Sequence, residues 1–293
     1  MPSLSFDRIA HAYDATRGYP NGITGQIIQA IERAANATAQ TRFIEVGVGT
    51  GRIAFPLASL GHIYTGVDIS EKMVEQLQEK IRAAQWQERE EAWGSLPDED
   101  TAQSAIVHRY ANPEQLASLR LMMADITALP LRNASFDVAV GVHIFHLVDG
   151  WQKAIQEIRR VLRPGGMLLH CWDEHNKLDI ADISGEWQKI LQSLGGNTQR
   201  PGASSVHFVT DWLTEQGLQP QKIEAVSWEH AVTPRQILDH TTQRIWSNTW
   251  NIPDAIFVPA TERLTVWVHE HYRDSIDTPR VQERRFVISK TVF

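Results

Sequence analysis

Three closely spaced glycines follow a short apolar run, and this arrangement constrains the fold more than any other feature of the chain. The apolar run is Phe43–Val46, and Gly47, Gly49 and Gly51 come directly after it. Glycines at this spacing let a strand turn sharply into a helix while the backbone comes close to a ligand. Backbone N–H groups at such a turn can face an anionic or polar partner. The sequence therefore predicts a strand, a ligand-binding turn and a helix in succession.

Short apolar runs alternate with helical patterns from about residue 41 to residue 172, which is typical of a parallel sheet covered by helices. The expected strands are Phe43–Gly47, Ile63–Val67, Leu119–Met123, Phe136–Gly141 and Met167–Trp172. We expect Ser70 to be the N-cap of the helix after the second strand, with Glu71 in its first turn. The pattern predicts an α/β fold with a doubly wound, mostly parallel sheet.

Beyond residue 172 the pattern changes to helices and two late strands. The late strands are expected at Lys222–Val232 and Arg285–Val292, and helices at about 184–194, 206–216 and 236–246 and after Pro259. Seven of the ten tryptophans lie at or beyond Trp172. They indicate either core packing or an apolar lid over a pocket.

The domain organisation follows from these patterns. We expect one domain over residues 1–293, with an N-terminal helical cap at 1–40 and a helical lid at 233–280 between the last two strands. Residues 83–118 interrupt the alternation, and a structureless connection of that length is unusual in a compact domain. We therefore expect a surface insertion there, with some helix near Pro113–Leu119.

Two aspartates stand at the ends of the second and third expected strands, Asp68 and Asp125. In a doubly wound sheet the carboxyl ends of the strands meet at one edge, where ligands bind. Asp68 suits paired ribose hydroxyls, because a carboxylate can accept both hydrogen bonds. Asp125 can accept a hydrogen bond from an exocyclic amine such as that of adenine. The alternative role for either carboxylate is a helix or turn cap.

Several short segments follow one another in a characteristic order within the first 172 residues. They are Phe6-Asp7, Tyr13-Asp14, Arg17–Pro20, Phe43–Gly51, Val67–Met73, Ala124–Ile126, Leu129–Leu131, Ser135–Asp137 and Val161–Gly166. As an ordered set they resemble the class I S-adenosylmethionine-dependent methyltransferases, in particular the small-molecule branch that includes the ubiquinone and menaquinone biosynthesis enzymes. Dinucleotide-binding dehydrogenases share the glycine turn, but their pattern needs a third glycine where this chain has Arg52.

The resemblance implies a seven-stranded, Rossmann-like sheet with an antiparallel last strand and S-adenosyl-L-methionine as the methyl donor, lying over the first strands. It implies the following donor-binding residues: Glu45, Gly47, Gly49 and Gly51 at the methionine part, Asp68 at the ribose, Ile69 or Met73 against the adenine, Asp125 and the Ile126 amide at the adenine edge, and Tyr13 and Arg17 near the donor carboxylate. The chain departs from the branch at residues 83–118. The end of the fourth strand also carries no motif that matches a known substrate.

Two histidines, His143 and His146, follow the fourth expected strand and are the best-placed proton acceptors. Histidine titrates near neutral pH, which suits a general base. A base is required only if the acceptor must lose a proton, because a sulfonium already carries an activated methyl group. Either imidazole could instead cap a backbone group. Further candidates for the pocket wall are Tyr19, His170, Trp172 and His175.

Composition and the remaining motifs argue against several other classes of function. The net charge is −7 and no block rich in Lys or Arg is present, so a nucleic-acid partner is not expected. The single cysteine, Cys171, suits a reducing cytosol and is expected to be a packed thiol. We expect no signal peptide, no membrane span and no metal site, and a cytoplasmic location. The loop Gly141–Ile144 lacks the Asn/Asp-Pro-Pro-aromatic motif of methyltransferases that act on amino groups of nucleic acid.

The sequence thus predicts an S-adenosylmethionine-dependent methyltransferase that acts on a small, apolar or aromatic acceptor. One alternative is a methyltransferase of RNA or protein. A second alternative is a regulatory protein that binds the donor without catalysis. The acceptor, the methylated atom and the oligomeric state stay open at this point.

Overall fold

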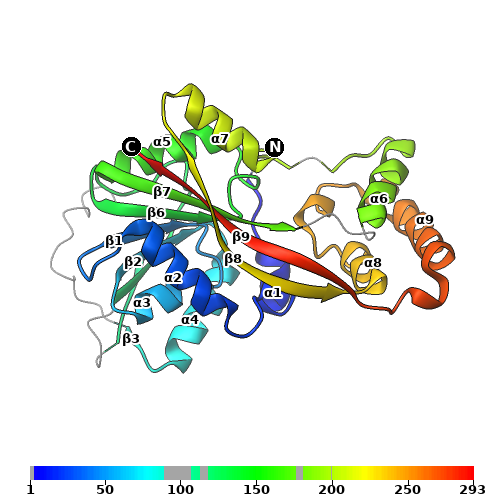
Figure 1. Cartoon of the computed structure of the whole chain (residues 1–293), viewed down its shortest axis with the longest axis horizontal. Coiled ribbons are helices and arrows are strands. Elements are labelled where there is room, and N and C mark those ends of the chain that lie inside the picture. The colour runs from blue at the N-terminus through cyan, green and yellow to red at the C-terminus, as the bar shows by residue number, and fades with distance from the viewer. Residues whose placement is uncertain (1–2, 89–106, 113–117, 176–180, 199) are drawn as a thin grey trace.

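The central sheet positions every functional element of this chain. The computed structural model describes residues 3–88, 107–112, 118–175, 181–198 and 200–293. Within these residues nine strands form one sheet in the order β3-β4-β5-β2-β1-β6-β7-β9-β8 (Figure 1). The strands are β1 (Arg42–Val46), β2 (Ile63–Asp68), β3 (Gln87–Glu88), β4 (Val107–Ala111), β5 (Ser118–Met123), β6 (Phe136–Val142), β7 (Leu162–His175), β8 (Gln221–Val232) and β9 (Arg280–Val292).

The strand directions confirm the predicted fold class. Strand β1 pairs in parallel with β2 and β6, β2 with β5, and β6 with β7. The last strand, β9, is antiparallel to both β7 and β8. The order of the strands reverses at β1, so the carboxyl ends of β1, β2 and β6 form the place where ligands bind in sheets of this kind.

The predicted number of seven strands is wrong, because two further strands lie in the expected insertion. Strands β3 and β4 pair with each other and extend the edge of the sheet, with β4 antiparallel to β5. Such short edge strands are defined by backbone pairing more than by an apolar pattern. The helix expected near Pro113–Leu119 is also wrong where it is described, since Ser118 and Leu119 belong to β5. Residues 89–106 and 113–117 lie outside the described residues.

Helices cover both faces of the sheet (Figure 1). The helices of the N-terminal half are α1 (Ala10–Arg17), α2 (Ile23–Ala35), α3 (Ala54–Ser59) and α4 (Glu71–Ala83), and α5 (Trp151–Val161) and α7 (Val206–Glu215) lie on the opposite face. Helices α2, α3 and α4 bury residues such as Ile31, Leu57 and Leu77 against Phe43 and Tyr64 of the sheet. Helix α5 buries Trp151, Ala154, Ile155, Ile158 and Val161, which recur at helical spacing.

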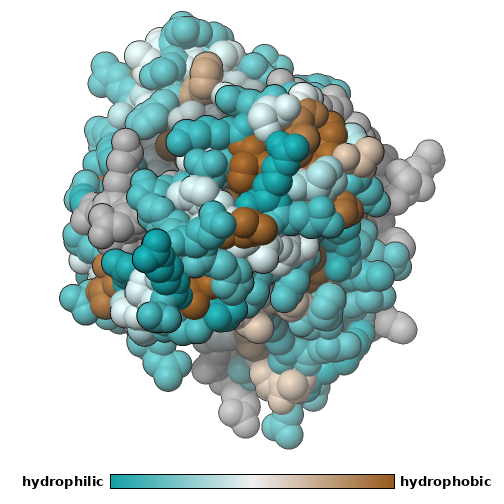
Figure 2. Space-filling view, turned by 90° about the vertical axis from the view of Figure 1, so that its right-hand side faces the viewer, coloured by the Kyte–Doolittle hydropathy of each residue, from teal (hydrophilic) through white to brown (hydrophobic). Residues whose placement is uncertain are grey.

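A separate group of helices, here called the cap, lies beyond the end of β7, β8 and β9 (Figure 1). It consists of α6 (Ala181–Ser193), α8 (Pro234–Thr242), the 3-10 turn η3 (Ser247–Thr249) and α9 (Asp254–Tyr272). The cap has its own buried core, which includes Trp187, Phe257 and Leu264. Apolar and polar residues intermingle on its outer face (Figure 2).

Local signals explain the boundaries of the cap helices. Helix α8 starts with a capping box in which Thr233 and Gln236 exchange hydrogen bonds with each other's backbone N–H. Helix α9 starts at Asp254, five residues before Pro259, so the prediction that it begins after the proline is wrong. Proline is usual in the first turn, but here the long helix continues past it and loses one backbone hydrogen bond.

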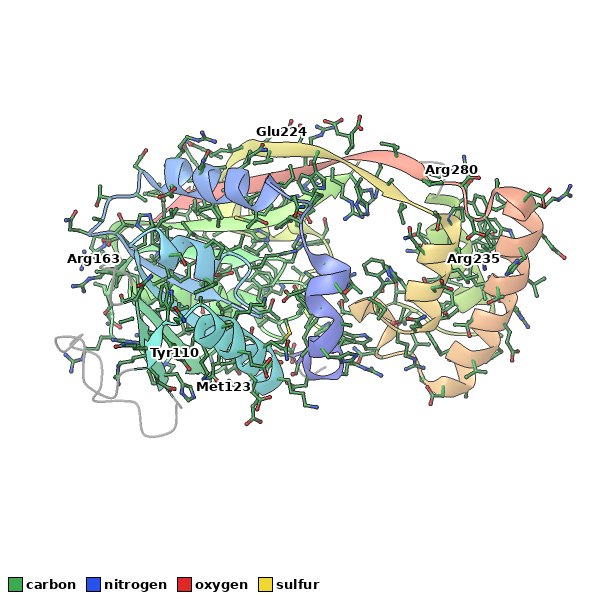
Figure 3. All side chains as sticks on the ribbon, turned by 90° about the horizontal axis from the view of Figure 1, so that it is seen from below. Tyr110, Met123, Arg163, Glu224, Arg235 and Arg280 are labelled. Atoms are coloured by element: carbon green, nitrogen blue, oxygen red, sulfur yellow. The ribbon has the colours of Figure 1, made fainter. Side chains whose placement is uncertain are left out.

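Helix α1 lies between the sheet and the cap in both ribbon views. In Figure 3 Arg235 and Arg280 mark the cap side, and Tyr110 and Met123 lie on the side of the sheet. The 3-10 turn η1 (Asp7–Ile9) precedes α1. No helix within the described parts of the chain combines the length and apolar character that crossing a membrane requires.

Candidate active site

A cavity of about 870 Å³ lies at the carboxyl ends of the central strands, between the sheet, helix α1 and the cap. Nine of the eleven residues that the resemblance assigns to the donor line it: Tyr13, Arg17, Gly47, Gly49, Asp68, Ile69, Met73, Asp125 and Ile126. Both candidate bases, His143 and His146, line it as well, whereas Glu45 and Gly51 do not. The volume is in the upper part of the range for small-molecule sites.

The glycine turn is closely packed on both sides. The φ angles of Gly47, Gly49 and Gly51 are 75°, 53° and 74°, in the left-handed region that favours glycine. A Cβ atom at Gly47 would lie 2.5 Å from Cδ1 of Ile144, and one at Gly51 would lie 2.2 Å from Cδ1 of Leu77. Gly47 therefore lets Ile144, in the loop after β6, pack against the turn, and Gly51 lets helix α4 do the same.

The Asp68 carboxylate organises the turn from the end of β2. Its Oδ2 accepts a hydrogen bond from the Gly49 N–H at 2.8 Å, and its Oδ1 accepts one from the Ser70 N–H at 2.9 Å. Burial raises the pKa of Asp68, and these backbone hydrogen bonds oppose the rise. Ser70 caps α4 by accepting a hydrogen bond from the Met73 N–H, with Glu71 in the first turn, which confirms the predicted N-cap.

Asp125 lies at the cavity wall after β5. Its Oδ1 accepts a hydrogen bond from the Thr127 N–H at 2.8 Å. One carboxylate oxygen therefore caps a turn, the role that the sequence offered for Asp125 as an alternative to adenine binding. The neighbouring Ile126 is buried, and Ile69 and Met73 line the same end of the cavity.

Glu45 lies beneath the turn, with only 2% of its surface exposed. The Tyr64 hydroxyl donates a hydrogen bond to its Oε2 at 3.0 Å, and the Ala54 N–H at the start of α3 also donates to it. Burial raises the pKa of Glu45 to about 8, against which the Tyr64 hydrogen bond acts. Glu45 thus links the end of β1 to the first turn of α3.

The N-terminal segment is fastened to the same turn. The Thr50 hydroxyl donates to Asp14 of α1 at 2.6 Å, and Lys80 forms an ion pair with the same carboxylate. The Arg17 guanidinium lies 4.5 Å from the ring centroid of Trp246, and its Nη2 donates to the Ile245 carbonyl at 3.3 Å. Its Nε is buried without a partner among the described residues. Arg17 therefore joins helix α1 to the segment Ile245-Trp246 beside the cap.

His143 is held at the end of β6 in an unusual backbone conformation. Its φ is 51°, and its N–H donates to the Cys171 carbonyl of β7 at 3.0 Å. Its Nε2 accepts a hydrogen bond from the Asp173 backbone N–H at 3.2 Å and lies 3.3 Å from Oδ2 of the same residue. The Tyr19 hydroxyl donates to the other oxygen of Asp173 at 3.3 Å. The three side chains form a hydrogen-bonded group in the cavity wall, and left-handed backbone at a bulky residue often marks a functional position.

The other candidates beside His143 have different environments. Burial lowers the pKa of His146 well below its ordinary value, with the Arg200 charge as the next cause. His170 and Trp172 are buried and lie outside the cavity lining, whereas Tyr19 and His175 line it. Cys171 is fully buried, and burial raises the pKa of its thiol, which confirms the predicted packed cysteine.

Several cavity residues were not identified from the sequence. Asp173 stands at the end of β7, and the rule that places ligands at strand ends could have indicated it. Arg52 served only to exclude a dinucleotide pattern, yet its guanidinium lies 4.2 Å from the Tyr19 ring centroid and donates to the Arg17 carbonyl. Arg200 and Arg284 come from a connecting segment and from β9, where no local pattern marks them.

Some tryptophans line the cavity, whereas others pack against neighbouring side chains. Trp187, Trp228 and Trp246 line the cavity, while Trp250 packs edge to face on Phe6 with ring centroids 4.7 Å apart. In the portion of the chain that the structure describes, no group of three or more His, Cys, Asp or Glu side chains is arranged to hold a metal ion.

The comparisons with known proteins agree with this geometry. Residues 44–168 match the family model described as a methyltransferase domain. An uncharacterised methyltransferase of Mycobacterium tuberculosis is 25% identical over 248 residues, which cover 84% of this chain and 79% of that protein. The demethylmenaquinone methyltransferase of Tropheryma whipplei is 27% identical over 181 residues, covering 60% of each protein.

Among solved structures, the YcgJ protein of Bacillus subtilis has a TM-score of 0.53 at 14% identity, covering 90% of this chain and 97% of that one. At this level of identity the likeness concerns the fold. The segment matched by the family model contains the glycine turn, Asp68, Asp125 and His143, and it ends within β7.

Proposed function

Given that this chain is a class I S-adenosylmethionine-dependent methyltransferase, we propose that it methylates a small, apolar or aromatic acceptor bound between the sheet and the cap. One observation carries the proposal. A single cavity joins the residues assigned to the donor to the His143–Asp173 pair, and it extends to Trp187 and Trp246 of the cap. Donor and acceptor would therefore lie in one enclosed space.

The residues present fit the donor in three respects. Gly47 and Gly49 bring bare backbone to the cavity wall, where a ligand can approach closely. Arg17 offers a buried Nε that has no partner in the described chain, which suits the donor's carboxylate. Asp68 and Asp125 place carboxylates at the ends of neighbouring strands, which suits ribose hydroxyls and an adenine amine. Glu45 would act from beneath the turn by holding β1 and α3 together.

The chemistry that the donor supplies is a methyl group on a sulfonium, already activated for transfer to a nucleophile. The work of the chain is then to hold the acceptor in line and to exclude water. Helix α1 and the cap enclose the cavity from two sides and supply that enclosure.

We propose that His143 acts as the general base when the acceptor must lose a proton. The Asp173 N–H donates to Nε2, so the neutral ring carries its proton on Nδ1, and Nε2 would take up the proton from the acceptor beside the Asp173 carboxylate. Tyr19 would fix the Asp173 carboxylate, and Asp173 would stabilise the resulting imidazolium. His146, whose pKa burial lowers, would remain neutral as part of the wall.

The acceptor class is supported by the lining of the cavity. Three tryptophans and the aliphatic Ile183 and Ile237 face it, and surfaces of this kind bind apolar bodies. The Tropheryma whipplei relative acts on demethylmenaquinone, which agrees with an apolar, aromatic acceptor. We also propose that residues 233–280 serve as a lid within a single domain and that residues 83–118 are a surface insertion. The unpaired cysteine favours a cytoplasmic location.

Donor binding is tested by calorimetry with S-adenosylhomocysteine. We expect a micromolar dissociation constant for the wild type, and a loss of roughly tenfold or more for Asp68→Ala, since two hydrogen bonds to a charged group are removed. Asp211→Ala, an exposed aspartate on α7, is the matched control and should bind normally. The absence of any heat with the wild type would refute the proposed function.

The role of His143 is tested with His143→Asn, because asparagine tolerates the left-handed backbone at this position better than alanine. We expect turnover to fall roughly 10²-fold while the affinity for S-adenosylhomocysteine stays within about threefold. An unchanged rate would remove His143 from the mechanism. Donor binding without turnover on any acceptor would favour the regulatory alternative.

A further inference from the structure

Four arginine side chains line the cavity together with three aspartates, Asp68, Asp125 and Asp173. The arginines are Arg17, Arg52, Arg200 and Arg284. Among the described residues none of the four guanidinium groups forms an ion pair. Their hydrogen-bond partners are neutral: two backbone carbonyls for Arg17 and Arg52, and for Arg284 the side-chain oxygen of Gln282, once its amide is oriented toward the guanidinium. Arg200 makes no hydrogen bond in the described structure.

The four cations lie close enough to influence one another. Burial lowers the pKa of Arg17, and the charges of Arg52, Arg200 and Arg284 lower it further. Asp173 interacts with both Arg52 and Arg284, and the buried Glu45 interacts with Arg52. Asp173 also partners His143 and Tyr19, so it cannot neutralise four arginines. Unpaired charges in a partly buried wall are unfavourable unless a ligand neutralises them.

The methyl donor does not neutralise the positive charge of these arginines. It carries one carboxylate against an ammonium and a sulfonium, so its net charge is positive. Arg17, with its unpartnered Nε, and Arg52, bonded to the Arg17 carbonyl, belong to the N-terminal segment and the glycine turn. They suit the donor's carboxylate. Arg284 then has only the shared carboxylate of Asp173 nearby, and Arg200 has no anion among the groups described.

These two arginines belong to the acceptor side of the cavity. The segment after Arg200 is tied to the loop that follows His143, because the Gly202 N–H donates to the His146 carbonyl at 3.2 Å. Arg284 stands on β9, and in the register of the sheet it pairs with Trp228 of β8, whose side chain also lines the cavity. Cationic groups therefore lie beside the proposed base and beside an aromatic wall.

A second observation points to a polar ligand in the same cavity. Trp187 of α6 is only 4% exposed and lines the cavity, yet its indole N–H has no hydrogen-bond partner within the described chain. A buried indole N–H normally donates to an acceptor atom. A ligand that brings oxygen atoms into the cavity would satisfy it.

Resting on the methyltransferase function proposed above, we propose that the methyl acceptor is an amphiphilic anion. Its apolar or aromatic body lies against the tryptophans of the cavity, and its carboxylate or phosphate is held by Arg200 and Arg284. Arginine suits this role, because its planar fork binds the two oxygens of such groups together.

The test uses the full chain saturated with S-adenosylhomocysteine and three probes that share one apolar body: octanoate, octyl phosphate and octanamide. Calorimetry should show that at least one anion binds roughly tenfold or more tightly than the neutral amide. The comparison of octanoate with octyl phosphate identifies the type of anion. In Arg200→Gln and in Arg284→Gln the preference should fall to about threefold or less, while Arg159→Gln, a change at the surface of α5, should keep it.

Each alternative result has a distinct meaning. Equal binding of the amide and both anions, or a preference that survives in both variants, would overturn the proposal. A loss of S-adenosylhomocysteine affinity of tenfold or more in Arg200→Gln and Arg284→Gln would overturn it too, because the arginines would then serve the donor. Failure of S-adenosylhomocysteine to bind the wild type would instead refute the proposed function. Since Arg200 makes no hydrogen bond in the described structure, Arg200→Gln keeps the test valid even if Arg284→Gln unfolds.

Discussion

Replacement of Glu45 by glutamine should make the chain less sensitive to rising pH. Folding raises the pKa of Glu45 from an ordinary value of 4.5 to about 8, because the carboxyl is buried. A carboxyl whose pKa is raised on folding binds more protons in the folded state than in the unfolded state. The contribution of protonated Glu45 to the free energy of unfolding is therefore fully present at low pH, and it is lost as the pH rises from about 4.5 toward 8.

The size of the effect follows from the linkage relation. One pKa unit corresponds to about 1.4 kcal/mol, so ionising Glu45 between pH 5 and pH 8 lowers the free energy of unfolding by up to roughly 3 to 4 kcal/mol. The glutamine side chain of the variant cannot ionise, and its carbonyl can still accept the hydrogen bond from Tyr64. Any constant cost of the substitution cancels when the same variant is compared at two pH values.

The measurement is urea unfolding of the wild type and Glu45→Gln at pH 5, 6, 7 and 8, with Glu75→Gln on the exposed side of α4 as the control. The difference in free energy of unfolding between Glu45→Gln and wild type should move in favour of the variant at every step upward in pH. Glu75→Gln should show a constant difference. A Glu45→Gln difference that stays within about 0.5 kcal/mol from pH 5 to pH 8 would refute the reasoning.

Three further predictions concern packing, catalysis and a surface contact. Gly51→Ala should lower the free energy of unfolding by about 2 to 3 kcal/mol through strain and overlap with α4, whereas Gly61→Ala, which has a positive φ but open space, should cost about 1 kcal/mol in the same denaturant assay. Asp173→Asn should reduce turnover roughly tenfold or more without changing the affinity for S-adenosylhomocysteine, and unchanged turnover would count against the His143 base. Arg160→Met removes hydrogen bonds to two backbone carbonyls and should destabilise by about 2 kcal/mol, while Arg163→Met, which loses one partly exposed ion pair, should cost less than about 1 kcal/mol; equal losses would contradict this ranking.

Local patterns in the sequence were sufficient for the donor end of the fold. The glycine turn, Asp68 and the Ser70 cap depend on residues within about 25 positions of one another, and a doubly wound sheet brings strand ends together by a general rule. The alternation of apolar runs was enough to predict the parallel strands. The edge strands β3 and β4 were missed because their pairing partner, and not their own pattern, defines them.

The acceptor end could not be predicted in the same way. Arg200 lies on a connecting segment and Arg284 on the last strand, and only the folded chain brings both near Arg17. The abundance of tryptophan indicated either a core or a lid. Which indoles face the cavity depends on how α6 and α8 pack together with α9, a property of tertiary contacts that no short pattern encodes.

The separate core of the cap has a consequence for how this enzyme could change its acceptor. Leu264, Val268 and Phe257 hold the cap helices together without help from the two cores that flank the sheet. Substitutions at cavity-facing positions such as Ile237 or Gln236 therefore remove little from the apolar packing that supports the glycine turn. Under the proposed function, the chain is a methyl-transfer unit joined to a separate module that recognises the acceptor, and selection for a new acceptor can act on that module alone.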